Sequence, residues 1–227
     1  MENLDEKLKE AIVCNDINFL KKNRDRYDIN HRFADEENDS LLLYAISDKG
    51  SETYRFFLDN GADTTLINDE GEGIIHAIVF SGIKERLLEF MKNHTFDINA
   101  QTNDGTTPLL LSISIEKYEM AKVLIETGAD INIGDNENIA PLHLASMVGN
   151  LEIVKLLMDK GANQYIKTDK GNYPLALAIN GDHENVAKYL FAKFYNPSPN
   201  QGDPHYYPVD KNNNKPNSTH YEYPIWQ

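Results

Sequence analysis

The chain has 227 residues, of which 41% are hydrophobic and 26% are charged, and these proportions exclude an intrinsically disordered polypeptide. Its formal net charge of −14, from 36 acidic and 22 basic residues, makes nucleic acid and anionic membrane surfaces poor partners. A basic protein is the natural complement of such a charge, although the charge would also serve solubility alone, and both interpretations stay open here.

The N-terminal segment gives no sign of export or membrane insertion. No apolar run approaches the roughly 18 residues that a membrane-spanning helix needs, and residues 1–6 are acidic where a secretory signal is basic. The single cysteine, Cys14, cannot build a disulfide framework and has no metal-ligand spacing. Its place in the first helical pattern predicts a small core residue. We therefore expect a cytoplasmic protein.

Two sequence markers recur with one period along most of the chain. The first, spaced by 33 or 34 residues, is the start of a helical pattern at Leu41, Ile74, Pro108, Pro141 and Pro174. The second, spaced by 33 to 35 residues, is an Asp or Asn after a short turn, at Asp28, Asp63, Asp97, Asp130 and Asn163. Because two independent markers keep the same period, the sequence indicates a stack of repeated units.

The residue types at these markers predict a unit of helix, turn, helix and hairpin. Proline at the first helical position loses no hydrogen bond, and Ser40 and Thr107 precede this position, where a hydroxyl can cap the helix. A small residue on the first helix lets neighbouring helices approach closely. The second helix is expected to end at Gly61, Gly128 or Gly161, because glycine adopts the left-handed conformation that closes a helix. A polar turn follows each end.

This pattern resembles the ankyrin repeat, whose usual form is Gly-x-Thr-Pro-Leu-His-x-Ala, a turn with glycine, a Val-x-x-Leu-Leu helix and Gly-Ala-Asp-x-Asn. Residues 135–167 match it best, with Ala140-Pro141-Leu142-His143 and Gly161-Ala162 in register. The third unit departs most, because Gly73 stands at the threonine position and residues 93–96 replace Gly-Ala. The resemblance implies an all-α ankyrin-repeat solenoid with β-hairpin tips.

Six units are expected along the chain, and the first of them would act as an end cap that faces water. They lie at about 4–34, 35–67, 68–101, 102–134, 135–167 and 168–194. We therefore divide the chain into an ankyrin-repeat domain at 1–194 and an irregular C-terminal tail, rich in Pro, Tyr and Asn, at 195–227.

The resemblance implies that the hairpin tips and first helices form a concave face that binds other proteins. Acidic residues concentrate on the expected tips, most densely in the N-terminal half. The tip residues predicted to contact a partner are Asp35, Glu36, Glu37, Asp39, Asp69, Glu70, Glu72, Asp104, Asn136, Glu137 and Asp169. Turn chemistry explains one acid per tip, but not the several acids of the first two tips. We expect these carboxylates to be solvated, without shifted pKa values.

An apolar strip is predicted beside these acids, at positions two and three after the small residue of each first helix. Phe80, Ser114, Ile115, Met147 and Val148 occupy these positions and are predicted to contact the partner. An apolar centre with a charged border is typical of a protein-binding patch. A shift of one residue in the register would return some of these side chains to the core, and this alternative stays open.

The composition changes after the last repeat. Residues 196–227 hold six of the nine prolines, and residues 211–215 are typical of a linker. The aromatic clusters at 206–207 and 221–226 are unlike an inert linker. We expect them, and Tyr223 and Trp226 in particular, to dock either on the solenoid or on the partner.

The sequence offers no catalytic arrangement. His76 and His143 occupy the Pro-Leu-His position, where the family uses histidine to brace adjoining loops, and the remaining histidines lack a second ligand at helical spacing. There is no Gly-x-Ser-x-Gly motif, phosphate-binding glycine loop or Cys–His pairing. We predict a module without enzymatic activity, cofactor or metal, monomeric when unbound, that binds neither nucleic acid nor membrane.

The predicted function is binding of a basic protein through the acidic concave face. One version is a stoichiometric inhibitor or immunity-type protein, bacterial in origin, that neutralises a toxin cleaving nucleic acid through a basic cleft. The alternative is an adaptor or effector that recruits a host protein through the apolar strip and the aromatic tail. Salt distinguishes the two, because steered charge pairing weakens as ionic strength rises.

Overall fold

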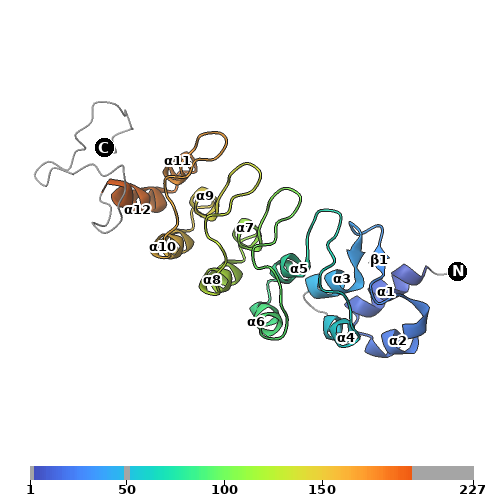
Figure 1. Cartoon of the computed structure of the whole chain (residues 1–227). Helices are drawn as coiled ribbons and strands as arrows, with labels where there is room; N and C mark the ends of the chain where they lie inside the picture. The colour runs from blue at the N-terminus through green and yellow to red at the C-terminus, as the bar shows by residue number, and fades with distance from the viewer. Residues whose placement is uncertain (1–2, 49–51, 196–227) are drawn as a thin grey trace, which may run out of the picture.

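In the computed structural model the chain forms a row of stacked helix pairs, with loops that project along one edge (Figure 1). The structure describes residues 3–48 and 52–195. The first helices of the pairs are α1 (Leu4–Val13), α3 (Leu41–Ser47), α5 (Ile74–Ser81), α7 (Pro108–Ser114), α9 (Pro141–Met147) and α11 (Pro174–Asn180). The second helices are α2 (Ile17–Lys22), α4 (Thr53–Asp59), α6 (Lys84–Asn93), α8 (Tyr118–Glu126), α10 (Leu151–Asp159) and α12 (Glu184–Tyr195). The predicted all-α solenoid is confirmed.

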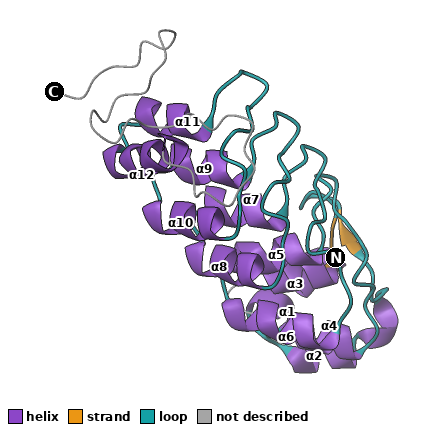
Figure 2. Cartoon of the chain, turned by 60° about the vertical axis from the view of Figure 1, so that its left-hand side comes forward, coloured by secondary structure: helices purple, strands orange, loops and turns teal. Residues whose placement is uncertain are grey.

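The helices form two layers beneath the projecting loops (Figure 2). The first helices contact one another along the stack from α3 to α11, and the second helices form a looser layer behind them. The small residues of the first helices are fully buried where the helices meet, at Ala45, Ser112, Ala145 and Ala178. Each unit buries its apolar side against its neighbours, so the core runs lengthwise through the stack.

The helix ends follow the residue types that predicted them. The Ser40 hydroxyl accepts a hydrogen bond from the Leu43 amide at 3.3 Å, and the Thr107 hydroxyl accepts one from the Leu110 amide at 3.2 Å. Gly61 directly follows the C-cap of α4 with a φ of +81°, a left-handed conformation that side chains with a Cβ rarely adopt. These local signals are sufficient to place the helix boundaries.

The hairpin tips form a third row along the stack. The first tip contains the strands β1 (Arg32–Phe33) and β2 (Asp39–Ser40), which pair antiparallel with Arg32 opposite Ser40. The later tips within the described residues are tight turns, such as the turn that the Asn68 amide closes on the Glu72 carbonyl at 3.0 Å. A short 3-10 helix, η1 (Arg24–Arg26), follows α2.

Backbone hydrogen bonds tie each tip to the next. They run from the amides of Asp69, Asn103, Asn136 and Asp169 to the carbonyls of Glu37, Glu70, Asp104 and Glu137, over 2.8 to 3.0 Å. The tips therefore form one continuous strip that spans five units, although they lie about 33 residues apart in the sequence. This strip sets the positions of the predicted acidic residues.

Two features of the units differ from the expected pattern. Cys14 is exposed, so the prediction of a core residue is wrong. It caps the C-terminus of α1, while Leu8, Ala11 and Ile12, at helical spacing, occupy the buried face. In the third unit, where Gly-Ala is missing, α6 ends at its C-cap His94 with an extended backbone, and the His94 ring stacks on Phe90 with centroids 4.5 Å apart.

Candidate protein-binding surface

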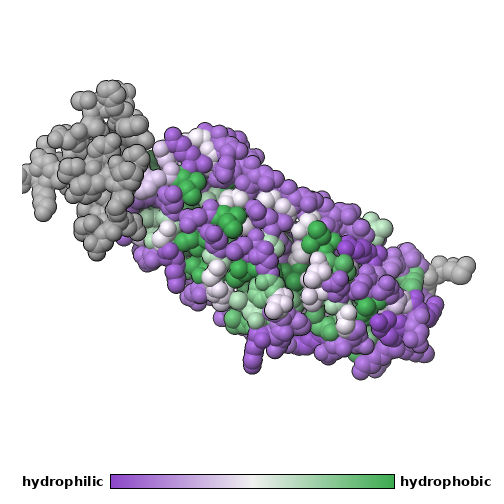
Figure 3. Space-filling view, viewed as in Figure 1, coloured by the Kyte–Doolittle hydropathy of each residue, from purple (hydrophilic) through white to green (hydrophobic). Residues whose placement is uncertain are grey.

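The acidic residues of the first three tips meet on the strip of tips. We call the acidic ridge the set of Glu37, Asp39, Asp69, Glu70, Glu72 and Asp104. Glu37, Asp69, Glu70 and Asp104 are exposed. The hydrophilic surface along the upper rim in Figure 3 lies over the hairpin tips, while apolar surface is gathered in separate patches below it. The ridge is thus a charged edge next to the first helices.

Asp39 and Glu72 lie deeper than expected, because adjacent tips enclose them. The side-chain amide of the buried Asn68 donates to both, at 3.1 Å to Asp39 and 3.0 Å to Glu72. Burial raises the pKa of Asp39 to about 6, against the opposing effect of the Asn68 hydrogen bond, and nearby acids add to the rise. Burial likewise raises the pKa of Glu72, with contributions from Glu37, Glu70 and Asp104. The prediction of solvated carboxylates without shifted pKa values is wrong for these two. It is also wrong in part for Asp35 and Asp104, whose pKa values are lowered by hydrogen bonds from Lys9 and Thr102.

The first two acids of the strip share one basic partner within the chain. The ammonium group of Lys9, on α1, lies 2.8 Å from both Asp35 and Glu36, and its hydrogen bond lowers the pKa of Asp35. The same ammonium group lies over the rings of Phe33 and Tyr44, 5.1 and 5.7 Å from their centroids. Asp35 and Glu36 are therefore structural partners of the first unit, and Lys9 offsets one of their two negative charges.

Other predicted contact residues also have structural partners. Glu137 pairs with Lys170 at 2.8 Å, and Asp169 accepts a hydrogen bond from Asn138 at 2.6 Å. The Asn136 amide donates to the Asn103 carbonyl of the preceding tip at 3.0 Å. Among the exposed predicted tip acids without a basic partner in the described structure, Glu37, Asp69, Glu70 and Asp104 lie on the first three tips, and Asp169 lies on the fifth.

One basic side chain does reach the ridge, but it is bound to carbonyl groups. The guanidinium group of Arg32 donates to the carbonyl of Asn38 at 2.9 Å and to that of Ile67 at 2.7 Å. It therefore joins the first two tips, and within residues 3–48 and 52–195 it forms no ion pair with a carboxylate of the ridge.

The predicted apolar strip is exposed at alternate positions. Phe80 is 38% exposed and Met147 is 44% exposed, and Ser114 lies between them on α7 with its side chain also exposed. Ile115 and Val148 are half-buried and pack on the core, because each caps its helix and turns back toward it. The structure therefore brings Phe80, Ser114 and Met147 to the surface and withdraws the other two. Tyr223 and Trp226 lie outside the described residues.

Sequence reasoning missed Ile67, which is 53% exposed beside the ridge. A signal for it exists, because the equivalent positions of the other units hold Ala34, Gln101, Gly134 and Lys167, none of which is a large apolar residue. An exposed aliphatic side chain next to acidic residues extends the apolar part of the candidate surface toward the tips.

The two motif histidines have the bracing role that was predicted. The Nδ1 atom of His143 accepts a hydrogen bond from the Ala140 amide at 3.1 Å, and its other ring nitrogen lies 2.9 Å from the Ile166 carbonyl of the next hairpin. His76 makes the same pair of contacts with Gly73 and Thr106. Burial lowers the pKa of both rings, so they remain neutral braces.

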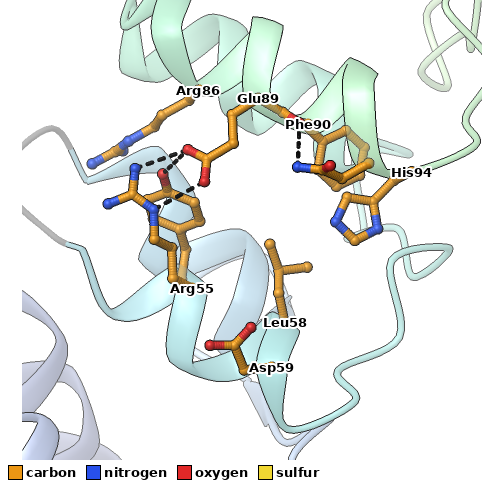
Figure 4. A pocket seen from close by; sticks show the side chains of 9 residues that line it. Arg55, Leu58, Asp59, Arg86, Glu89, Phe90 and His94 are labelled. Carbon is orange, nitrogen blue, oxygen red and sulfur yellow. Dashed lines mark hydrogen bonds and ion pairs between the residues drawn. The ribbon is translucent and has the colours of Figure 1, made fainter.

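A cleft between α4 and α6 lies on the second helices, away from the strip of tips (Figure 4). Its carboxylate, Glu89, accepts hydrogen bonds from the guanidinium of Arg55 at 2.8 and 3.1 Å and from the Tyr54 hydroxyl at 3.1 Å. Arg86, only 3% exposed, donates to the carbonyls of Ile46 and Asp48 at 2.7 and 2.6 Å. These contacts join the second and third units, so the polar groups of the cleft serve the fold.

The described residues contain no group of three or more His, Cys, Asp or Glu side chains that could hold a metal ion. None of the described helices is long and apolar enough to cross a bilayer. The candidate site of this chain is thus a surface of tips and first helices, with charge on one side and a few apolar side chains on the other.

Comparison with known proteins defines the class. A family model of ankyrin repeats in three copies matches residues 42–135 and 132–203, more than half of the chain, and the chain therefore belongs to the ankyrin-repeat family. It is also similar to the neurogenic locus notch homolog protein 1 of Mus musculus, Rattus norvegicus and Cricetulus griseus, with 29% identity over 99 residues in each case. That match covers 44% of this chain and 4% of each relative.

Ankyrin repeats are generally protein–protein interaction modules, and the family is typically non-enzymatic. The chain spans about 4% of the length of the curated relatives that it matches. The similarity therefore supports the repeat architecture and its general use in binding proteins.

Proposed function

We propose that the chain binds a basic protein through the acidic ridge, with Ile67, Phe80 and Met147 as apolar contacts beside it. The observation that carries this proposal is the crowding of like charges across three tips, which contributes to the raised pKa values of Asp39 and Glu72. Such crowding costs free energy in the unbound chain, and a cationic partner removes that cost. A rigid stack of units presents the surface without an ordering step.

Binding of a basic partner should release protons. A positive charge near Asp39 lowers its pKa from about 6, so the carboxyl group ionises more fully in the complex. The affinity is then expected to fall as the pH drops below about 6, because protonated Asp39 contributes no charge to the contact. Calorimetric titrations in buffers with different ionisation enthalpies measure the number of protons released.

In a specific form of the proposal, the basic partner is a toxin that cleaves nucleic acid, and the chain inhibits it stoichiometrically by covering its basic cleft. This form includes a cytoplasmic encounter and a chain that is monomeric before it binds. The single cysteine suits a reducing compartment, where structural disulfides are rare.

The first experiment compares two double variants that change the net charge equally. Glu37→Lys/Glu70→Lys removes exposed ridge charges whose side chains form no hydrogen bond or ion pair within the described residues, and so leaves the Asn68 contacts in place. Glu126→Lys/Asp159→Lys removes exposed charges at the ends of α8 and α10 on the opposite layer. The probe is a labelled oligolysine peptide, and fluorescence anisotropy at low and at physiological salt reports its affinity.

The ridge variant should lose about tenfold in affinity at low salt, and the control variant about twofold or less. The difference should narrow as salt is added, since exposed charges are screened. An equal loss in both variants means that the chain attracts cations only through its total charge, and it contradicts the proposal.

A second candidate function rests on the exposed apolar residues. Phe80 and Met147 protrude from the C-terminal turns of α5 and α9, where an adaptor would hold a partner with little charge. Binding of this kind tolerates salt. The test needs a partner protein that has been isolated. If the Phe80→Ser/Met147→Ser variant no longer binds that partner while the ridge variant still binds it, the adaptor function is favoured.

A further inference from the structure

The C-terminal end of the stack exposes apolar positions that the preceding unit buries. On α11, Leu175, Leu177 and Ile179 are half-buried. Their equivalents on α9 are Leu142, Leu144 and Ser146, with exposed fractions of 2%, 9% and 0%. The equivalents of Ile179 on the earlier first helices, Ile46, Val79 and Ile113, are at most 1% exposed. We call Leu175, Leu177 and Ile179 the end face.

The helix α11 has the same pattern of apolar residues as the internal first helices, whose apolar side chains pack against the following unit. The end face is apolar for this reason. Stacked repeats bury a continuous core, so a terminal unit needs a polar outer side or a cover. A small cleft lined by Ile179, His183 and Ala187 adjoins the end face between α11 and α12. An apolar surface of this kind is a candidate docking site.

We propose that residues 221–226 of this same chain occupy the end face. The segment Tyr221-Glu222-Tyr223-Pro224-Ile225-Trp226 is the most apolar and aromatic part of the region beyond α12. Proline at 224 restricts Tyr223 to extended backbone. In an extended segment Tyr221, Tyr223 and Ile225 lie on one side, which matches a row of three apolar side chains on a short helix.

The length of the connection is suitable. The helix α12 ends at Tyr195, beside α11, and 25 residues separate Tyr195 from Tyr221. A flexible chain of that length spans on average about 25–30 Å, more than the roughly 10 Å length of a seven-residue helix. Tethering at this distance corresponds to a local concentration in the millimolar range, so even a weak contact is largely formed.

Charge also favours the tail over a second copy of the chain at this place. Residues 196–227 hold two lysines and three acidic residues, so the tail lacks the strong negative charge of the whole chain. It can approach the stack without the repulsion that opposes a second copy carrying a net charge of −14. A second copy and an external partner remain outcomes that the experiment separates.

Trp226 is the only tryptophan of the chain, so its fluorescence reports on the tail alone. In the full chain we expect its emission to lie to the blue of the emission of the urea-unfolded chain, with reduced quenching by acrylamide. Leu177→Asp on the end face should shift both signals to their unfolded values. Leu88→Asp, at a side chain on α6 that is 47% exposed, is the matched control and should leave both signals unchanged.

A variant in the tail tests the same contact even if Leu177→Asp prevents the stack from folding. Tyr223→Ser should red-shift Trp226 as Leu177→Asp does, while the far-ultraviolet circular dichroism of the stack is retained. The conservative variant Leu177→Met should preserve the blue-shifted emission.

Three results would overturn the proposal. The first is a Trp226 emission that already equals that of the unfolded chain. The second is a blue-shifted emission that both Leu177→Asp and Tyr223→Ser leave intact, which places Trp226 elsewhere. The third is an emission that shifts to the red on dilution together with dissociation of a dimer in sedimentation, which makes a second copy the occupant.

Discussion

The two ends of the solenoid differ in how the apolar side of the terminal unit is covered. At the N-terminal end, α1 buries Leu8, Ala11 and Ile12 and turns Glu6 and Glu10 toward solvent. At the C-terminal end, α11 keeps the apolar pattern of an internal unit, and Leu177 and Ile179 stay half-exposed. The first unit is therefore a cap by its own sequence, whereas the last unit still requires a cover.

The comparison shows that the residue pattern of a unit does not by itself determine which of its side chains are buried at the ends of a stack. An internal unit has two neighbours, and most apolar positions of its first helix are buried between them. A terminal unit has one neighbour, so the same residue pattern that forms core in α9 forms surface in α11. The ridge shows a related asymmetry, because the acids of the first tip have a lysine from α1 while the acids of the next tips do not.

The largest expected effect breaks the N-terminal cap. Leu8→Ala should lower the free energy of unfolding by about 3 kcal/mol, because Leu8 is fully buried and the shortened side chain leaves a cavity. Leu177→Ala, at the half-exposed opposite end, should cost about 1 kcal/mol or less. Urea denaturation followed by circular dichroism measures both. Equal costs would show that the two ends are equally well packed.

The next effect concerns the joint between the N-terminal units and the rest. Arg86 takes a position that holds Met120, Ile153 and Val186 in later units. Arg86→Ile restores the usual residue type, yet it should destabilise the chain by about 2 kcal/mol, because the carbonyls of Ile46 and Asp48 lose their donor. Urea midpoints test this expectation. A stabilised variant would mean that the apolar pattern outweighs the two hydrogen bonds.

A third effect tests the ridge through its pH dependence. The folded-state pKa of Asp39, about 6, lies above its ordinary value of 3.8, so the folded chain favours the neutral carboxyl group. Below about pH 4 the carboxyl is protonated in both states and carries no penalty, and stability is lost as the pH rises through about 6. Asp39→Asn should remove this loss and stabilise the chain by about 1–2 kcal/mol at neutral pH.

The measurement is the free energy of unfolding of both chains between about pH 4 and pH 7. Asp169→Asn, at an exposed tip acid of the C-terminal half, is the control, and its stability should follow that of the unmodified chain. If the free energy of unfolding of Asp39→Asn changes with pH in the same way as that of the unmodified chain, the crowding of charge at the ridge carries no energetic cost.

The smallest effect compares two lysines that pair with tip acids. Lys9→Gln should cost about 1 kcal/mol or less, because Lys9, with a side chain only 15% exposed, loses Asp35, Glu36 and two aromatic rings. Lys170→Gln should have no measurable effect, since the Lys170–Glu137 pair is exposed on both sides. Thermal unfolding resolves the first change, and similar shifts in both variants would remove the distinction between the two ends.

The sequence by itself determined the fold of this protein. The helix starts at Ser40 and Thr107, the glycine at 61 and the bracing histidines act within one unit or between adjacent loops, so their residue types are sufficient to predict them. Repetition then strengthens these local signals at helix starts and ends, because each unit shows the same period as the previous one. The acidic character of the tips was likewise visible in the chain.

Only the tertiary structure decided which of those acids are free to act. The distance between Asn68 and Asp39, the pairing of Lys9 with the first tip and the place of Arg86 depend on how units about 33 residues apart are offset in space. Sequence spacing places two residues on adjacent units, but their burial depends on the angle at which the units stack. For that reason Asp39, which was expected to be solvated, is partly buried, and Cys14, which was expected in the core, is exposed.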